Sequence, residues 1–287
     1  MRSAVCAACL VVLSAAATFS NAQNTAQASL DTAWTVLNTG LENTDTTVRV
    51  RATRELGELD GNAKAEAAAI SALKNDKQPQ VRAAAAQALG DMGAKDAKAD
   101  LYEAFQDTEP SVIIAAAHSL VQLGDDRGYN VYYAILTGQQ KTGTSLTDQQ
   151  KQLLKDKRKM AALGAEAAVG FIPFGGLAVS GYKVLTRDDT SPVLAAAALM
   201  LAKDADPKSG NALADASANQ DKWLVRAAAF DALAKRGNPV YLDAAETGLQ
   251  DANDQVRVAA AACAIHLSDI QSHPKPEETK PATRRRK

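Results

Sequence analysis

The sequence is poor in the residues that cross-link small folds. It has three cysteines in 287 residues, and two of them, Cys6 and Cys9, lie within an apolar N-terminal segment that we expect to be removed. Cys263 then remains as a single thiol, and one cysteine cannot form an internal disulfide. The mature fold must therefore be held together by its hydrophobic core.

Groups suited to catalysis are also scarce. The chain has three histidines, none followed by glutamate, and it has no cluster with the spacing of metal ligands. Gly170 and Gly175 have the spacing of a phosphate-binding loop, but Gly176 and Leu177 occupy the places where lysine and serine or threonine are required. No serine stands in a nucleophile elbow. The sequence thus predicts no catalytic residue, metal or cofactor, and we expect a protein that is not an enzyme.

An excess of positive charge is missing from the main part of the chain. Residues 271–287 carry six basic and two acidic side chains, which leaves residues 23–270 with a net charge of −6. An acidic body argues against a groove for nucleic-acid phosphates. The 271–287 tail holds three of the nine prolines and almost no apolar residues. We therefore expect this basic tail to be disordered.

Long hydrophobic runs are absent except near the N-terminus, where residues 1–22 have the pattern of a signal peptide. Arg2 precedes an apolar run over residues 4–17, and Ser20 and Ala22 suit a cleavage site. The run is too short to span a bilayer. We expect an exported protein, either periplasmic or secreted. The lack of any Asn-x-Ser/Thr sequence favours a bacterial periplasm.

What the chain does contain is a repeated phrase that begins with valine, most clearly VRAAAAQAL at Val81 and VRAAAFDAL at Val225. Six such valines are separated by 33, 31, 81, 32 and 31 residues. A period near 32 indicates an array of supersecondary units, with an insertion of about 49 residues in the longest interval. The six valines are Val48, Val81, Val112, Val193, Val225 and Val256.

Each phrase has the periodicity of an amphipathic helix. Counted from the valine, apolar or small residues occupy positions 0, +4 and +8 in every phrase and also +3 and +7 in all but the first, as in Val81, Ala84, Ala85, Ala88 and Leu89. A more polar helix is expected before each phrase, and the corner between the two helices carries an acid five residues before the valine. The expected first helices include 63–75, 94–106, 207–219 and 239–250, and the corner acids are Asp76, Asp107, Asp188 and Asp251, with Asn43 in the first unit. Such acids can accept hydrogen bonds from N–H groups at a helix start.

These features together resemble the HEAT-like repeat of the phycobilisome-lyase type, in which Val-Arg-x-Ala-Ala opens the second helix of a hairpin. The resemblance implies an all-α fold, a right-handed α-solenoid of about seven stacked helical hairpins over residues 23–270. We expect hairpins at 26–59, 61–92, 94–124, 126–170, 173–204, 207–237 and 238–270, each touching only its neighbours. The fourth carries the insertion, at about residues 138–186.

The insertion contains an uncharged stretch, Ala167–Tyr182, which Pro173 interrupts. It is interpreted first as part of two core helices, with Phe171 and Phe174 filling the corner between them. A partner-docking surface is the second reading, because large exposed apolar patches usually mark interaction sites. Contact with a membrane interface is the third, although this segment will not span a bilayer.

Candidate partner-binding residues come from the corners and from the insertion. Trp223 stands at a corner where other units carry small or polar residues, and an aromatic there could anchor a partner. The arginines after valine could contact a ligand, but pairing with an acid of their own or the next corner is the competing interpretation. The candidates are Trp223, Arg82, Arg226, Arg257, Tyr133, Phe171 and Phe174.

The function predicted from these features is an exported scaffold that binds another protein or peptide through its curved face. An enzyme or chaperone-like lyase for a tetrapyrrole is the alternative that the resemblance implies. A third alternative is a peripheral membrane adaptor that uses residues 167–182, helped by the basic tail.

Overall fold

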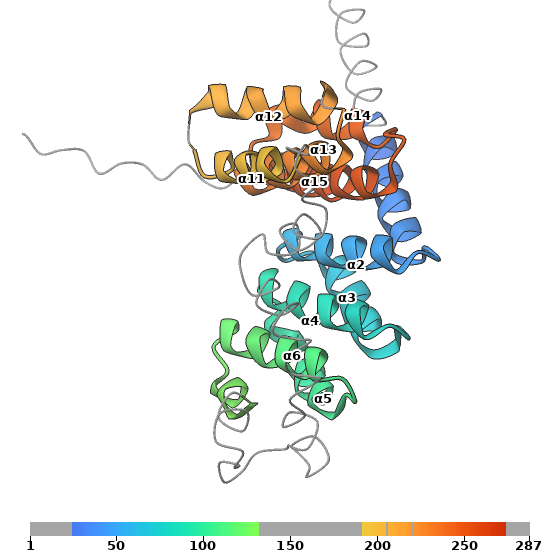
Figure 1. Cartoon of the computed structure of the whole chain (residues 1–287), viewed down its shortest axis with the longest axis vertical. Coiled ribbons are helices and arrows are strands. Elements are labelled where there is room, and N and C mark those ends of the chain that lie inside the picture. The colour runs from blue at the N-terminus through green and yellow to red at the C-terminus, as the bar shows by residue number, and fades with distance from the viewer. Residues whose placement is uncertain (1–24, 132–190, 205, 220, 274–287) are drawn as a thin grey trace, which may run out of the picture.

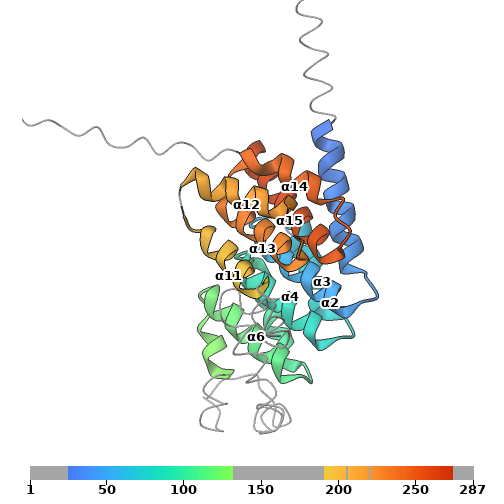
Figure 2. The ribbon, with the colours of Figure 1, turned by 45° about the horizontal axis from the view of Figure 1, so that its top comes forward.

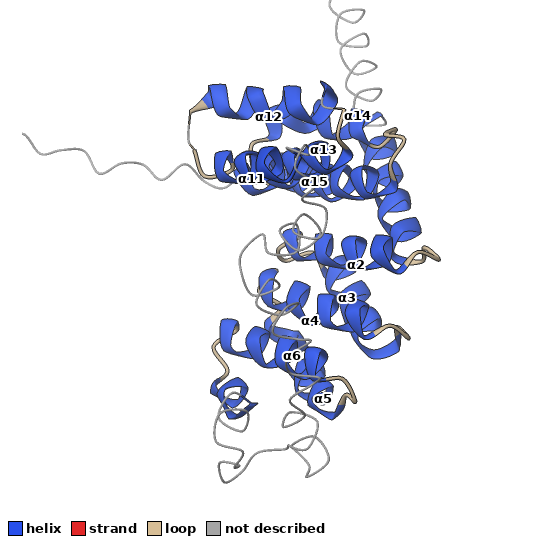
Figure 3. Ribbon diagram, viewed as in Figure 1, coloured by secondary structure: helices blue, strands red, loops and turns tan. Residues whose placement is uncertain are grey.

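A computed structural model describes residues 25–131, 191–204, 206–219 and 221–273. Throughout these ranges the regular structure is helical and contains no strand (Figure 3). The all-α prediction is thereby confirmed. The predicted signal peptide and insertion lie outside the described residues, as does the basic tail beyond residue 273; the first two residues of that tail, expected to be disordered, instead continue helix α15. None of the helices in the described ranges is long and apolar enough to cross a membrane.

The helices alternate between first and second members of hairpins, at the predicted period. The first helices are 25–41, α3 (Ala63–Asn75), η2–α5–η3 (Lys95–Gln106), α12 (Pro207–Asn219) and η5–α14 (Pro239–Gly248). The second helices are α2 with η1 (Thr46–Glu58), α4 (Pro79–Asp91), α6 (Pro110–Gln122), α11 (Ser191–Leu201), α13 (Trp223–Arg236) and α15 (Asp254–Ser272). A short 3-10 turn, η4 (Asp126–Gly128), follows α6.

Local sequence explains where a second helix begins and ends. Pro79 opens α4, where its missing N–H would have no partner inside the helix. The helix stops at Gly93, whose φ of 69° is the left-handed conformation that glycine adopts without strain. The N–H of Ala94 then donates to the carbonyl of Leu89 at 3.0 Å and closes the end of the helix. Between these signals the predicted stripe is buried, from Val81 to Leu89.

The hairpins form two curved layers (Figure 1). The second helices lie side by side in the order α11, α13, α15, α2, α4, α6 and line the inner side of the curve. The first helices cover the outer side, each packed on the second helix of its own hairpin. In space the hairpins therefore run fifth, sixth, seventh, first, second, third.

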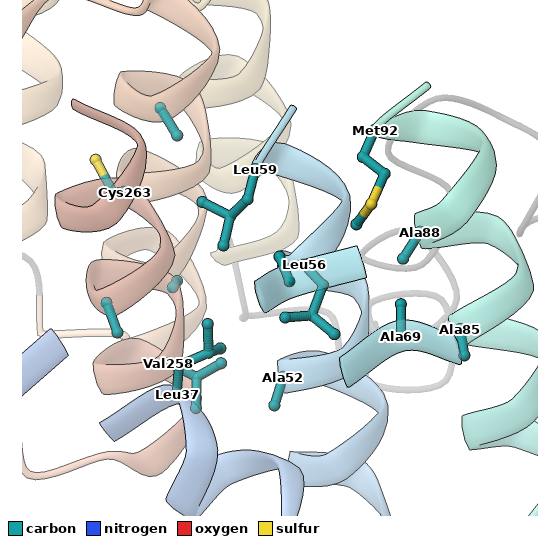
Figure 4. Close-up of a cluster of buried hydrophobic side chains, with 14 of the residues drawn as sticks. Leu37, Ala52, Leu56, Leu59, Ala69, Ala85, Ala88, Met92, Val258 and Cys263 are labelled. Carbon is teal, nitrogen blue, oxygen red and sulfur yellow. The ribbon is translucent and has the colours of Figure 1, made fainter. Parts of the chain in front are cut away.

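This order corrects one sequence-based expectation, because the seventh hairpin packs directly on the first. A methyl group built on Gly40 would lie 2.7 Å from Val258 of α15 and 3.0 Å from Ala52 of α2, which shows how closely the three helices approach. Figure 4 shows Leu37, Ala52 and Val258 gathered at this junction. The physical reason is that every hairpin presents the same kind of small, apolar flank, so hairpins distant in sequence can stack like consecutive ones.

The array thus consists of two arms that meet in its middle. We call residues 191–273 the C-terminal arm and residues 25–131 the N-terminal arm; both views show α15 beside α2 (Figures 1 and 2). Residues 131 and 191, which lead toward the insertion, lie at opposite ends of the layer of second helices.

Candidate interaction face

A row of arginine–aspartate pairs runs along the edge formed by the corners. In three of the four units in which arginine follows the repeat valine, its guanidinium reaches the acid of the next corner, with Nε to Oδ2 distances of 3.0 Å in Arg49–Asp76 and 2.7 Å in both Arg82–Asp107 and Arg226–Asp251. The Nη1 group also donates to a backbone carbonyl of the arginine's own corner, as from Arg82 to Asp76 at 2.9 Å. Each arginine therefore ties two consecutive hairpins together.

The corner acids shape the turn and do not cap the helix directly. Asp76, Asp107 and Asp251 each accept a hydrogen bond from the backbone N–H two residues later, at 2.8–2.9 Å. The helix begins at least one residue beyond that N–H, and in α15 the cap is Asn253, which accepts from Gln255 at 2.9 Å. In α4 and α6 the N-cap residues make no side-chain cap hydrogen bond, and in all three hairpins the corner acid holds the arginine of the preceding hairpin.

These contacts define the surroundings of the three arginines predicted to bind a partner. Arg82 and Arg226 are held in ion pairs of the edge row. Arg257 pairs instead with Asp254 of its own helix, because the next corner in space is that of the first hairpin, where Asn43 replaces the acid. The Asn43 amide donates to Asp254 at 3.3 Å and joins the row across the junction. A role of these arginines in partner binding stays a prediction.

Replacing Asp107 by asparagine is expected to lower the free energy of unfolding by about 1 kcal/mol, since it removes the charge from one well-aligned pair near the surface. Chemical denaturation at low and high salt would measure this, and the difference from the parent should shrink as salt screens the pair. A loss of unfolding free energy that is several times larger and does not depend on salt would contradict our interpretation that each pair of this row contributes only modestly to stability.

Trp223 is the one aromatic candidate for partner binding that lies within the described residues. It is the first residue of α13, and 40% of its surface is exposed. Leu194 of α11, at the position where other units carry the edge arginine, is 44% exposed. Tyr133, Phe171 and Phe174 lie outside the described residues, so their predicted roles stay predictions.

The inner face of the array is polar and is built from positions +6 and +10 of the second helices. Exposed side chains there include Arg54 of α2, Asp91 of α4, Gln122 of α6 and Lys235 of α13. His118 of α6 is half-buried on this face, and burial lowers its pKa while nearby Asp91 opposes the shift. Its helix position alone would suit a solvated surface residue, but the side chain is partly covered.

A buried charge cluster crosses this face where the two arms meet. Nη2 of Arg51 lies 2.5 Å from Oδ1 of Asp231, although the two residues are 180 positions apart in the chain, and their side chains are each 11% exposed. Arg51 also pairs with Glu55 one turn further along α2, whose side chain is 7% exposed. Glu58 pairs with Lys235 beside them.

Burial governs the ionisation of this cluster. Loss of solvation raises the pKa of the Glu55 carboxyl from 4.5 to about 8, and repulsion from Asp231 and Glu58 adds to the shift, against the opposing attraction of Arg51 and Lys235. Burial likewise raises the pKa of Cys263, a thiol on α15 within the field of the same carboxylates. Cys263 itself is fully buried in the core.

Sequence reasoning missed this cluster, but a signal was present. Position +3 is alanine in the second helices of the other phrases and Arg51 in the first, and position +7 is uncharged elsewhere and Glu55 in the first. Charged residues at stripe positions indicate that the first hairpin has an unusual neighbour. Asp231 gives no comparable signal, because position +6 already varies between units.

Two curved layers of repeated helical hairpins define the class of protein as an α-solenoid. The family model for HEAT repeats matches residues 35–121, 66–137 and 182–265, which together cover more than half of the sequence, and the chain belongs to the HEAT-repeat family. In the ranges that the structure describes, no three histidine, cysteine, aspartate or glutamate side chains are grouped so as to hold a metal ion.

Solved structures similar to this chain include two enzymes or enzyme components. Human deoxyhypusine hydroxylase in complex with glycerol is 16% identical, with a TM-score of 0.33, over 85% of this chain and 98% of that one. The CpcE–CpcF complex of phycocyanin lyase from Nostoc sp. PCC7120 is 23% identical, with a TM-score of 0.32, over 80% of this chain and 93% of that one. No curated protein sequence matched the chain.

Proposed function

We propose that this protein is an exported, non-catalytic scaffold that binds another protein or a peptide through the inner face of its array. The observation that supports this most is the continuity of that face: neighbouring second helices from both arms present polar side chains to one concave side. Arg54, Asp91, Gln122 and Lys235 supply both signs of charge and hydrogen-bonding groups on a rigid helical base. Complementary charges favour specific recognition of a folded or extended partner.

The corner edge is a less suitable docking surface than the inner face, because its arginines are already held by corner acids and backbone carbonyls. A partner docking there would have to displace those pairs. On the inner face Lys235 pairs with Glu58, and the Gln122 amide donates to Asp91 at 3.4 Å. The signal-peptide pattern of residues 1–22 supports the exported location, where a scaffold without disulfides would rely on its packed core.

Site-specific photo-cross-linking would test the proposal. A photoreactive residue at Gln122, exposed on the inner face, should yield an adduct of defined mass in an envelope extract. The same residue at Lys95, exposed on the outer side, should yield none. Adducts of equal yield at both sites, or none at Gln122, would reject inner-face binding.

Turnover of a bilin by the purified protein, seen as a change in visible absorbance, would favour the lyase-like alternative. An uncleaved N-terminus in the cell would argue against export.

A further inference from the structure

The buried charge cluster joins two helices that are not adjacent in the layer. Arg51, Glu55 and Glu58 belong to the first hairpin, whereas Asp231 and Lys235 belong to α13, and α15 lies between them. Side chains can meet across an intervening helix only where the layer bends and that helix is narrow. Small, buried residues of α15, including Ala259, Ala262 and Cys263, provide this narrow place. We call the five charged residues the clamp.

The clamp contains five ionisable groups, so it cannot be electrically neutral when all of them are charged. Three carboxylates, those of Glu55, Glu58 and Asp231, face two cations, those of Arg51 and Lys235. Lys235 and Glu58 balance each other and are partly exposed, but Arg51, Glu55 and Asp231 are nearly buried, so two carboxylates there face one guanidinium. A net charge in that buried part is unfavourable, and one proton on a carboxylate removes it. We propose that the closed clamp holds this extra proton and that releasing it relaxes the bend between the two arms, widening the inner face.

Groups on every neighbouring element contribute to this balance. On α2 and η1 they are Arg51, Arg54, Glu55 and Glu58; on α13, Asp231 and Lys235; on α15, Cys263 and the half-buried His266; and on α4 and α6, Asp91 and His118. Of these, Glu55 is the most deeply buried carboxylate and the group whose ionisation the cluster opposes most.

The sign of the pH dependence follows from the raised pKa of Glu55. In the closed state this pKa is about 8, and once the clamp opens to solvent it returns toward 4.5. Protonation therefore favours the closed state fully below the open-state pKa, and this contribution is lost as the pH rises through about 8. Arg51 stays a cation throughout, because its neighbouring carboxylates raise its pKa further.

A distance measurement between the arms tests the inference without any partner. Spin labels would be placed on cysteines introduced at Lys208 of α12 and Lys95 of the third hairpin, both exposed, in a full chain whose three native cysteines are replaced by alanine. In the parent we expect a narrow distance distribution at pH 6 and a longer, broader one at pH 9.5, with the change complete by about pH 8. Because no partner is present, failure here would leave inner-face binding untouched.

Two variants distinguish opening of the clamp from a general loss of structure at alkaline pH. Glu55→Gln should keep the short distance at both pH values, since the amide remains neutral. Asp107→Asn, which alters an edge pair of the same array, should follow the parent at both. Circular dichroism at each pH would establish that helix content is unchanged. A parent distance that does not respond to pH, or an equal response in Glu55→Gln, would overturn the proposal.

Discussion

Replacing Leu89 by aspartate should unfold the N-terminal arm around α4 and lower the free energy of unfolding by roughly 3 kcal/mol or more. Leu89 is completely buried, and α4 packs against both α2 and α6. The substitution removes apolar packing and leaves a carboxylate without a cation in the core. Thermal melting followed by circular dichroism would measure the loss.

Hydrogen exchange would show where the damage from Leu89→Asp lies. Because each hairpin contacts only the hairpins beside it in space, protection should fall in α2, α4 and α6 and persist in α11 and α13. Gln80→Asp is the matched control: Gln80 is exposed in the first turn of α4, where an acid suits the helix dipole. A melt of Leu89→Asp that coincides with the parent would contradict the assigned helix register.

Replacing Arg51 by methionine should cost about 3–5 kcal/mol, the loss typical when one partner of a buried ion pair is removed. Methionine fills similar volume but leaves Asp231 and Glu55 without their cation. At neutral pH Glu55 keeps its proton, so most of the cost comes from the Asp231 carboxylate. Denaturant unfolding of the variant and the parent at pH 7 would give the difference.

A second substitution makes the Arg51 result specific. Combining Arg51→Met with Asp231→Asn should recover much of the lost free energy, since no unpaired carboxylate then remains on α13. The deficit of the single variant should also shrink as the pH falls toward the ordinary pKa of an aspartate. Arg82→Met should cost less, about 2 kcal/mol, because Asp107 keeps the hydrogen bond from the N–H of Glu109 when its guanidinium partner is removed. Equal losses of unfolding free energy for Arg51→Met and Arg82→Met would show that the clamp stabilises the protein no more than an edge pair does.

Much of the fold was predictable because each hairpin encodes its own geometry. The bounds of α3 and α12 agree with those expected from the apolar pattern and from Pro207. Pairing of the arginines with corner acids was the competing interpretation of the same motif, and the structure shows that the acid is that of the next corner. These signals are local, and a local signal repeated along a chain specifies a stack of hairpins.

The closing of the last hairpin onto the first was not predictable from the repeat, because the repeat describes every interface in the same terms. Contacts between residues far apart in the sequence decide which hairpin flanks meet. Examples are the packing of Gly40 against Val258 and the ion pair of Arg51 with Asp231. The candidate inner face follows from this order, since Lys235 and Glu58 meet only because the arms join. Periodicity alone gives no information on such a contact.

The junction between α15 and α2 has a consequence for how the protein matures. The first hairpin to be synthesised has one flank uncovered until the last hairpin arrives, so the centre of the molecule is completed by the final stretch of chain. A protein cut short near its C-terminus would lose a central piece and not a peripheral one. Among the described residues, the two arms would then be joined directly only by the pairs of Arg51 with Asp231 and of Lys235 with Glu58, and the uncovered apolar flanks would be open to proteases.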